Sequence, residues 1–367
     1  MANVNPLAWP KGVKLLCELC QQPALVQCTK CMVTYYCDTD HQKADWESIH
    51  EIICHLLVPL RTLPAFQCLS DEREHQRVQL QQRQKQLIEM TLSTAQLKLS
   101  KGNPGEALPA AIHCLRFSTE LYGINTIESV PSYLLLAEVN LGLGRLMQAE
   151  EYLTQSQWVI MKNPECSHVL HQKLCRSYGL LCSIKGDLEE AIRYLANEVY
   201  FASEEFGCNS TAAAGGFYHM ANVFSQQGKT DIADSFYTEV ISIWHTVLSK
   251  MVKVYNAGVD SPNWRTSPTP DTEDISHQLD LFDEAQRAEA SQILNSILDV
   301  QEKATKQEPD KICRTLHTLA MLHYLNTDLS KAQDLCSKAL LVSHQVPNLD
   351  LTGHIESFMQ QMQLKPS

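Results

Sequence analysis

The chain has 367 residues, enough for two or three domains, and a formal net charge of −12 at pH 7. This acidic balance argues against a surface that reads nucleic acid, because such surfaces usually present clustered lysine and arginine. The sequence has no apolar stretch of the roughly 18 to 20 residues that a membrane span needs, and Pro6, Pro10 and Lys11 interrupt any apolar run of a signal peptide.

The N-terminal segment contains eight side chains of the types that bind metal ions. They are six cysteines and two histidines: Cys17, Cys20, Cys28, Cys31, Cys37, His41, His50 and Cys54. A structural zinc site takes four such ligands, and a Cys-x2-Cys pair delivers two thiolates from one tight turn. Eight ligands therefore predict two closed zinc sites. Because closed sites leave no position for a catalytic water, we expect the metal to stabilise a segment too short to build its own core.

This segment resembles the MYND-type zinc fingers, and the resemblance extends to Tyr36 and Trp46. It implies that the two sites interleave. One zinc ion would be bound by Cys17, Cys20, Cys37 and His41, and the other by Cys28, Cys31, His50 and Cys54. The sequence departs from the family at His41, where cysteine is more usual, and one extra residue lies between His41 and His50. We therefore expect the turn after Trp46 to differ slightly from the family pattern.

MYND fingers usually bind short proline-rich or extended peptides beside a strand, against a glutamine and a tryptophan. The resemblance assigns these two roles to Gln42 and Trp46, with Thr34, Tyr35 and Tyr36 offering the strand edge. The alternative is that Trp46 only packs against its own helix. The finger is therefore a candidate peptide-binding module.

After the finger, residues 71–86 predict a charged, glutamine-rich connecting helix, and a repeat of 42 residues begins. Glycines recur at this interval, each followed five residues later by an alanine: Gly102, Gly144, Gly186 and Gly228, with Ala107, Ala149, Ala191 and Ala233. Twelve residues before each alanine stands another small residue. A fixed period of this size is typical of stacked helical hairpins. The glycine would end the first helix, and the small residues would let the two helices approach closely.

The repeats resemble tetratricopeptide repeats, and the third copy, from Cys175 to Leu195, matches best. Those repeats usually have about 34 residues, and the longer period here resembles that of kinesin light chains. The resemblance predicts a mainly α fold, an α-solenoid with four repeats over residues 71–253 and a concave groove for partners. The groove-facing candidates are Gln96, Glu138, Lys173, Arg176, Tyr218 and Asn222. Each of them is equally compatible with an ordinary solvated position.

The period is interrupted after the fourth copy. The alanine of the next copy, Ala332, lies 99 residues beyond Ala233, one period plus 57 residues. Residues 256–275 are rich in proline, serine and threonine and predict an exposed loop. Residues 276–363 predict a further helical hairpin, a fifth repeat and a capping helix from Leu351 to Met362.

Catalysis is not expected. MYND fingers also occur in SET-domain lysine methyltransferases, but here the finger starts at residue 17 and repeats begin soon after residue 85, which leaves no segment for a methyl-donor pocket. The sequence also lacks a glycine-rich phosphate loop, a nucleophile elbow and a paired-carboxylate signature. We therefore expect a non-enzymatic adaptor for proteins and peptides, with no nucleic-acid or membrane partner. The remaining eight cysteines are scattered on helical patterns, as expected of thiols in a reducing compartment.

The layout of the whole chain, with the runs Val33–Cys37 and His41–Trp46, resembles that of MYND proteins of cilia and sperm flagella. This resemblance implies a cytoplasmic scaffold of the axoneme that works with other tetratricopeptide proteins and the dynein machinery. The alternative is a nuclear transcriptional co-regulator that recruits proline-rich motifs. The chain has no basic import cluster and no DNA-binding module, so that role would depend on the finger alone.

Overall fold

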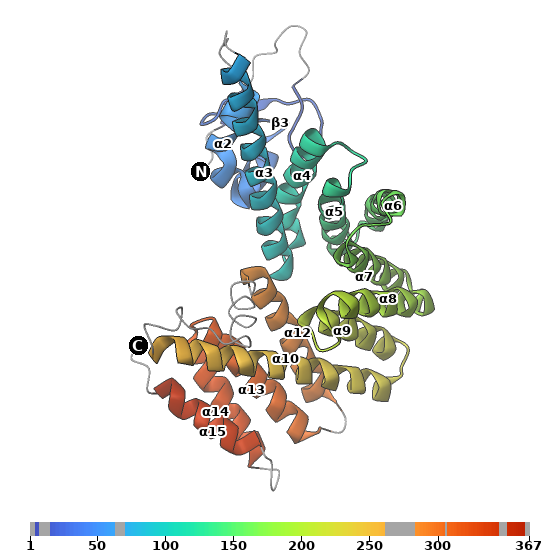
Figure 1. The fold of residues 1–367 in the computed structure, drawn as a ribbon, viewed down its shortest axis with the longest axis vertical. Helices are drawn as coiled ribbons and strands as arrows, with labels where there is room; N and C mark the ends of the chain where they lie inside the picture. Colours follow the sequence, from blue (N-terminus) through green and yellow to red (C-terminus); the bar gives the residue numbers. More distant parts are fainter. Residues whose placement is uncertain are drawn as a thin grey trace. The chain divides into compact units, whose positions relative to one another are not determined.

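The computed structural model describes residues 4–6, 15–62, 70–260, 283–304, 307–344 and 351–363. These residues form helices almost throughout, which confirms the predicted mainly α class (Figure 1). They divide into two compact units, residues 1–177 and 178–367, and each unit is described by itself. No helix in the described ranges is both long enough and apolar enough to cross a lipid bilayer.

The first unit opens with the finger, which contains a small antiparallel sheet. Its strands are β1 (Val4–Pro6), β2 (Val26–Cys28) and β3 (Tyr35–Tyr36), with β2 in the centre. A continuous helical stretch follows: α1 (Thr39–Asp45), the π-helical turn η1 (Trp46–His50) and α2 (Glu51–Arg61). The π turn lies where the sequence has its extra residue, and the Glu51 N–H bonds to the Trp46 carbonyl five residues earlier. A π turn takes up one residue more than an α turn, so the expected irregularity after Trp46 is confirmed.

Helical hairpins make up the rest of the first unit. The helices are α3 (Ser70–Ser100), α4 (Pro104–Tyr122), α5 (Val130–Gly142) and α6 (Leu146–Lys162), with a 3-10 turn η2 (Ile127–Ser129) before α5. Helix α3 packs against α4, α4 against α5, and α5 against α6. The predicted connecting helix at 71–86 is not separate, because α3 runs without a break into the first repeat.

The second unit continues the hairpins. Helix α7 (His168–Lys185) begins in the first unit and ends in the second. It is followed by α8 (Leu188–Phe206), α9 (Thr211–Gln226), α10 (Thr230–Asp260), α12 (Glu284–Lys303), α13 (Pro309–Leu325), α14 (Leu329–Ser343) and α15 (Leu351–Gln363). Helix α10 includes residues 256–260, so the predicted start of the loop at residue 256 is wrong. The rest of the predicted loop, residues 261–275, lies outside the described residues. Ile355, Phe358 and Met362 of α15 are buried in the core that α13 and α14 share, as expected of a capping helix.

The turn inside each hairpin is built in the same way. Gly102, Gly144, Gly186 and Gly228 have positive φ angles of 80°, 71°, 87° and 75°. The next residue donates its N–H to the carbonyl five residues earlier, as Asn103 does to Lys98 at 3.0 Å. This is the Schellman arrangement that ends a helix, so the predicted role of the glycines is confirmed. In the fifth copy Thr327 takes the glycine position with a φ of 61°, and Asp328 bonds to the His323 carbonyl at 3.0 Å.

The small residues of the repeat also have the predicted role. Ala95, Ala137 and Ala221 are completely buried. At the equivalent Gly179, an added Cβ would lie 2.6 Å from a methyl carbon of Leu195 on the paired helix. The two helices of that hairpin are therefore too close for any larger side chain at this position.

Two histidines meet between α10 and α13 in the second unit: His317 is buried and His245 is half-buried. His245 Nε2 lies 3.2 Å from His317 Nδ1. Burial, with the nearby charges of Arg314 and His354, lowers the pKa of His245 to about 4. Burial, with the neighbouring His245 and His354, lowers the pKa of His317 to about 3. Both rings are therefore neutral in the folded protein at neutral pH.

The strained turn at Thr327 predicts a stabilising substitution. A left-handed backbone costs a β-branched residue about 1 kcal/mol or more, so Thr327→Gly is expected to raise the free energy of unfolding by about 0.5 to 1 kcal/mol. The reverse change, Gly228→Thr, is expected to lower it by about 1 to 2 kcal/mol, because open space around Gly228 leaves only the backbone cost. Urea unfolding measures both. Equal stability of Thr327→Gly and the parent would contradict this reading of the turn.

The histidine pair predicts acid sensitivity. An unfolded histidine has a pKa of about 6.5, so between pH 6.5 and pH 4 the unfolded chain binds more protons than the folded one. The free energy of unfolding is then expected to fall as the pH is lowered through this window, and to be fully restored above it. His317→Gln should flatten the pH dependence, while His344→Gln, at an exposed position, should not. Equal slopes for the two variants would refute the assignment.

Candidate metal centre and partner surface

The first ligand cluster joins the start of the finger to α1. Cys20 Sγ lies 3.5 Å from Cys37 Sγ. His41 Nδ1 lies 3.6 Å from Cys17 Sγ and 3.0 Å from Cys37 Sγ. The four ligand atoms all lie within 4.8 Å of one another. Three sulfur atoms and one ring nitrogen therefore converge on a single point.

The second cluster joins the turn after β2 to η1 and α2. Cys28 Sγ lies 4.0 Å from Cys54 Sγ, and Cys31 Sγ lies 3.7 Å from His50 Nε2. All four side chains, including Cys54, are buried. Hydrogen bonds from Cys31 and His50 lower the pKa of Cys28 to about 3. The Cys28 thiolate and burial together raise the pKa of Cys31 and of Cys54, and a bound zinc cation offsets this repulsion between neighbouring thiolates.

Both clusters fit zinc ions. A Zn–S bond of about 2.3 Å places the sulfur atoms of a tetrahedral site about 3.8 Å apart, close to the separations in both clusters. The grouping is the interleaved one predicted from the resemblance, so the protein has two Cys₃His sites for structural zinc. Four protein ligands complete a tetrahedral shell, and such a site stabilises folding.

A buried carboxylate connects the second cluster to the repeats. Asp45 is completely buried; its Oδ2 accepts a hydrogen bond from the Tyr36 hydroxyl at 2.6 Å and lies 3.7 Å from His50 Nδ1. His113 Nε2, on α4, donates to Asp45 Oδ1 at 2.8 Å. Burial opposes ionisation of Asp45, but His113, His50 and Tyr36 together hold its pKa below the usual value. The carboxylate thus places a negative charge behind a zinc ligand and is hydrogen-bonded to a repeat helix.

The finger and the first repeat share one hydrophobic core. Ile49, Ile53 and Leu57 are buried against Leu87 of α3 and against three alanines of α4, namely Ala107, Ala110 and Ala111. Folding the finger therefore also completes the core of the first hairpin.

An ion cluster closes the edge of this contact. Glu18 lies between two zinc ligands in sequence and is almost fully buried. Its carboxylate pairs with Arg61 of α2 at 2.5 Å and with Arg116 of α4, and Arg116 also donates to the Glu18 carbonyl at 2.6 Å. Although burial opposes it, the two arginines hold the pKa of Glu18 below its usual value. The buried charge is thereby satisfied from both the finger and the repeat.

The predicted peptide-binding residues of the finger lie in different environments. Gln42 is only 3% exposed, so a docked peptide could not reach it in this conformation, and its predicted surface role does not fit. Trp46 is half-buried, with its ring centre 5.7 Å from that of His50 and 4.2 Å from the Lys30 ammonium. Tyr35 is half-buried, and its hydroxyl donates to the Met32 carbonyl at 3.5 Å. Peptide binding by Trp46 and Tyr35 stays a prediction.

Two of the predicted groove residues are engaged inside the second unit. The Tyr218 hydroxyl donates to Ser296 Oγ of α12 at 3.0 Å, and Asn222 Oδ1 accepts from Tyr237 at 2.7 Å. Helix α12, which belongs to the inserted segment, buries Ile293 in the same core. Tyr218 and Asn222 are half-buried and hydrogen-bonded within the unit, and their groove role stays a prediction. The other four candidates, Gln96, Glu138, Lys173 and Arg176, are half-buried, and their role stays a prediction.

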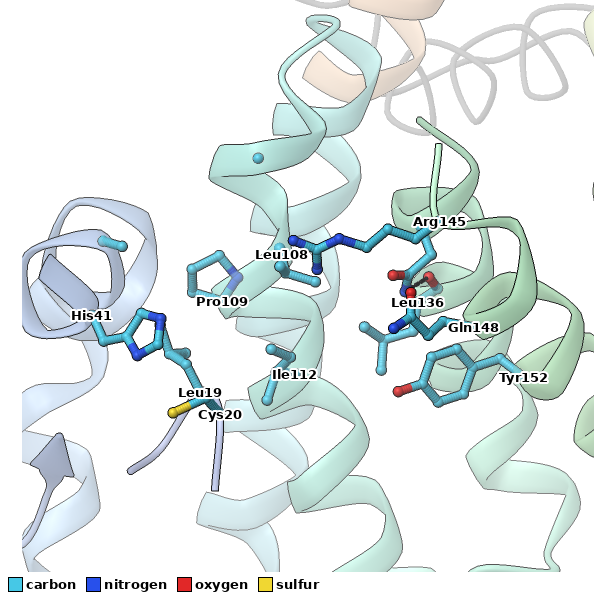
Figure 2. Close-up of a pocket in the computed structure, with 13 residues that line it drawn as sticks. Leu19, Cys20, His41, Leu108, Pro109, Ile112, Leu136, Arg145, Gln148 and Tyr152 are labelled. Carbon is cyan, nitrogen blue, oxygen red and sulfur yellow. Dashed lines mark hydrogen bonds between the residues drawn. The ribbon is translucent and has the colours of Figure 1, made fainter. Parts of the chain in front are cut away.

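A cleft of about 410 Å³ lies between the finger and the repeats of the first unit (Figure 2). Its finger side is formed by Leu19, Cys20, His41 and Ala44, and its repeat side by Gly105, Leu108, Pro109, Ile112, Leu136, Asn140, Arg145, Gln148 and Tyr152. No local pattern marks this surface in the sequence, because its residues come from four separate helices and from the turns at Leu19–Cys20 and Arg145.

Comparison with known proteins identifies the finger. Residues 17–54 match the model of the MYND finger family. Among solved structures, BtubC (BKLC) from P. vanneervenii is similar at 14% identity and a TM-score of 0.29, covering 70% of this chain and 91% of that one. A Podosopora anserina protein described as a kinesin light chain with nearly identical TPR-like repeats is similar at 18% identity and a TM-score of 0.27, covering 60% and 97%. The assignment of helical repeats here rests on the helix pairing and the 42-residue period of this chain.

The two clusters predict two zinc ions per chain. Cys28→Ser is expected to lower the zinc content of the purified full chain from two ions to one, because it removes a ligand of the second cluster only. Cys208→Ser, at an exposed position outside both clusters, is the control and should retain both ions. Metal content can be measured by mass spectrometry. One ion in the unaltered chain would rule out the paired sites.

The buried carboxylate predicts a second effect on the metal. Asp45→Asn keeps all eight ligands but removes the charge behind His50, and it is expected to weaken zinc binding at the second cluster about 10- to 100-fold. Asp40→Asn, on the exposed face of α1, serves as the matched control. Competition with a chelator measures the affinity. If both variants bound zinc as tightly as the parent, Asp45 would have no role in holding the ligand.

Proposed function

We propose that this protein is a non-enzymatic adaptor that binds partner proteins through a rigid surface made jointly by the MYND finger and the helical repeats. The observation that carries the proposal is the shared core. Ile49, Ile53 and Leu57 of the finger are buried against the first hairpin, and both parts line one cleft. Two closed zinc sites and stacked hairpins supply a fixed surface, and such surfaces commonly bind peptides.

We further propose that the adaptor acts in the axoneme of cilia and sperm flagella, with other tetratricopeptide proteins and dynein-associated proteins as partners. The support for this location is the resemblance of the layout and of the runs Val33–Cys37 and His41–Trp46 to MYND proteins of those organelles. The acidic balance of −12 is compatible with protein partners.

Proximity labelling tests this proposal. The full chain, fused to a labelling enzyme at its C-terminus, would be expressed in ciliated cells, with Cys28→Ser as the control that disturbs the finger. Enrichment of axonemal proteins, reduced in the control, is the expected result. Enrichment of chromatin proteins would support the nuclear alternative and overturn the location. Binding of S-adenosylmethionine to the purified chain would overturn the non-enzymatic assignment.

A further inference from the structure

We propose that the cleft between the finger and the first repeats binds an extended peptide segment of a partner protein, in which an internal Asp or Glu side chain pairs with Arg145 and neighbouring apolar side chains fill the floor. This inference rests on the adaptor function proposed above. It adds the place of the site, the chemistry of the ligand and the residue that selects it.

The floor of the cleft is apolar. Leu108 and Ile112 of α4 are half-buried, Leu136 of α5 is buried, and Leu19 of the finger faces them across the cleft (Figure 2). A volume of about 410 Å³ is within the range of pockets that hold a drug-sized group. The floor can therefore take a few bulky side chains, but not a folded domain.

The backbone of α4 also suits an extended ligand. Gly105 is exposed and has no side chain, so another backbone can approach it closely. Pro109 has no N–H, so the Gly105 carbonyl cannot receive the usual helical hydrogen bond from position 109. Both residues line the cleft.

The charge of the cleft selects an acidic group. Two lining residues are basic, Arg145 and His41. The Arg145 guanidinium carries a permanent positive charge, whereas His41 belongs to the first zinc cluster and turns its Nδ1 toward Cys37. Arg145 is exposed and forms no ion pair within the described part of the chain. Figure 2 shows its guanidinium reaching over the cleft toward Leu108. In a chain with a net charge of −12, a free arginine beside an apolar floor is complementary to a carboxylate.

The edges of the cleft favour a chain that continues beyond it. Exposed residues stand on both sides, with Ala44 on the finger and Gln148 on α6. Half-buried Tyr152 adds an aromatic ring and a hydroxyl at the α6 side, a combination common where proteins bind peptides. The site is thus open at its rim, and an extended segment can enter and leave it.

Selection from a peptide library provides the test. The zinc-loaded full chain would be immobilised and challenged with random 16-residue peptides displayed on phage. We expect the enriched peptides to carry Asp or Glu next to Leu, Ile or Phe. Enrichment without an acidic position would overturn the assignment of Arg145. If no peptide is enriched, the cleft assignment fails, while the adaptor function is tested separately by the proximity labelling above.

Binding of one enriched, fluorescein-labelled peptide would then be measured by fluorescence polarisation. Arg145→Gln is expected to weaken binding at least tenfold and to reduce its salt dependence, and Ile112→Ser is expected to weaken it as well. Arg83→Gln, an exposed arginine of α3 outside the cleft, should bind normally. If Trp46→Ala abolishes binding while Arg145→Gln does not, the adaptor function stands and the cleft assignment fails.

A second copy of the chain is the competing occupant. Sedimentation of the full chain should show no self-association that depends on Arg145. A dimer that is lost in Arg145→Gln would mean that the cleft is an interface between copies, and the partner assignment would be overturned.

Discussion

The structure of the first unit depends on one buried carboxylate. Asp45 has no access to water, and a charge in that position is tolerated only when several donors surround it. Two donors come from different places, Tyr36 on the sheet and His113 on a repeat helix, and the ring of His50 at the metal cluster lies 3.7 Å away. None of these elements can adopt its final position alone without leaving the carboxylate unsatisfied. The finger and the first hairpin are therefore expected to form together.

Because the finger and the first hairpin depend on each other, the zinc sites are only one part of what stabilises the finger. A segment of about 40 residues cannot build a sufficient core by itself, and metal is one solution. Here the finger also buries Ile49, Ile53 and Leu57 against the repeats, and Ser48 donates to the Glu106 carbonyl of α4 at 2.7 Å. The metal organises the finger, and the hairpin supplies the hydrophobic surface. Together they hold both walls of the cleft at a fixed spacing.

Much of this could be predicted from the sequence, because the signals are local or periodic. Cysteine spacing identified the ligands, and the interval between glycines identified the hairpins, since a left-handed turn strongly favours glycine. The pairing of Asp45 with His113 could not be predicted, because 68 residues separate the two side chains and neither belongs to a motif. The position of α12, the helix of the inserted segment, could not be predicted either, because no residue near Tyr218 indicates that Ser296 will contact it. The cleft was missed for the same reason.

The π turn sets the rotation of α2 about its axis, so that one face of the helix carries a metal ligand and another packs against the repeats. One additional residue in a regular α-helix would rotate everything beyond it by about 100° around the axis. Cys54 would then turn away from the metal, and Ile53 and Leu57 would turn away from the repeats. The wider turn at Trp46–His50 absorbs that rotation, so that one side of α2 still meets zinc and another still meets the hairpin core. The π turn thus lets the segment between His41 and Cys54 hold one more residue without disturbing either the metal ligands or the packing against the repeats.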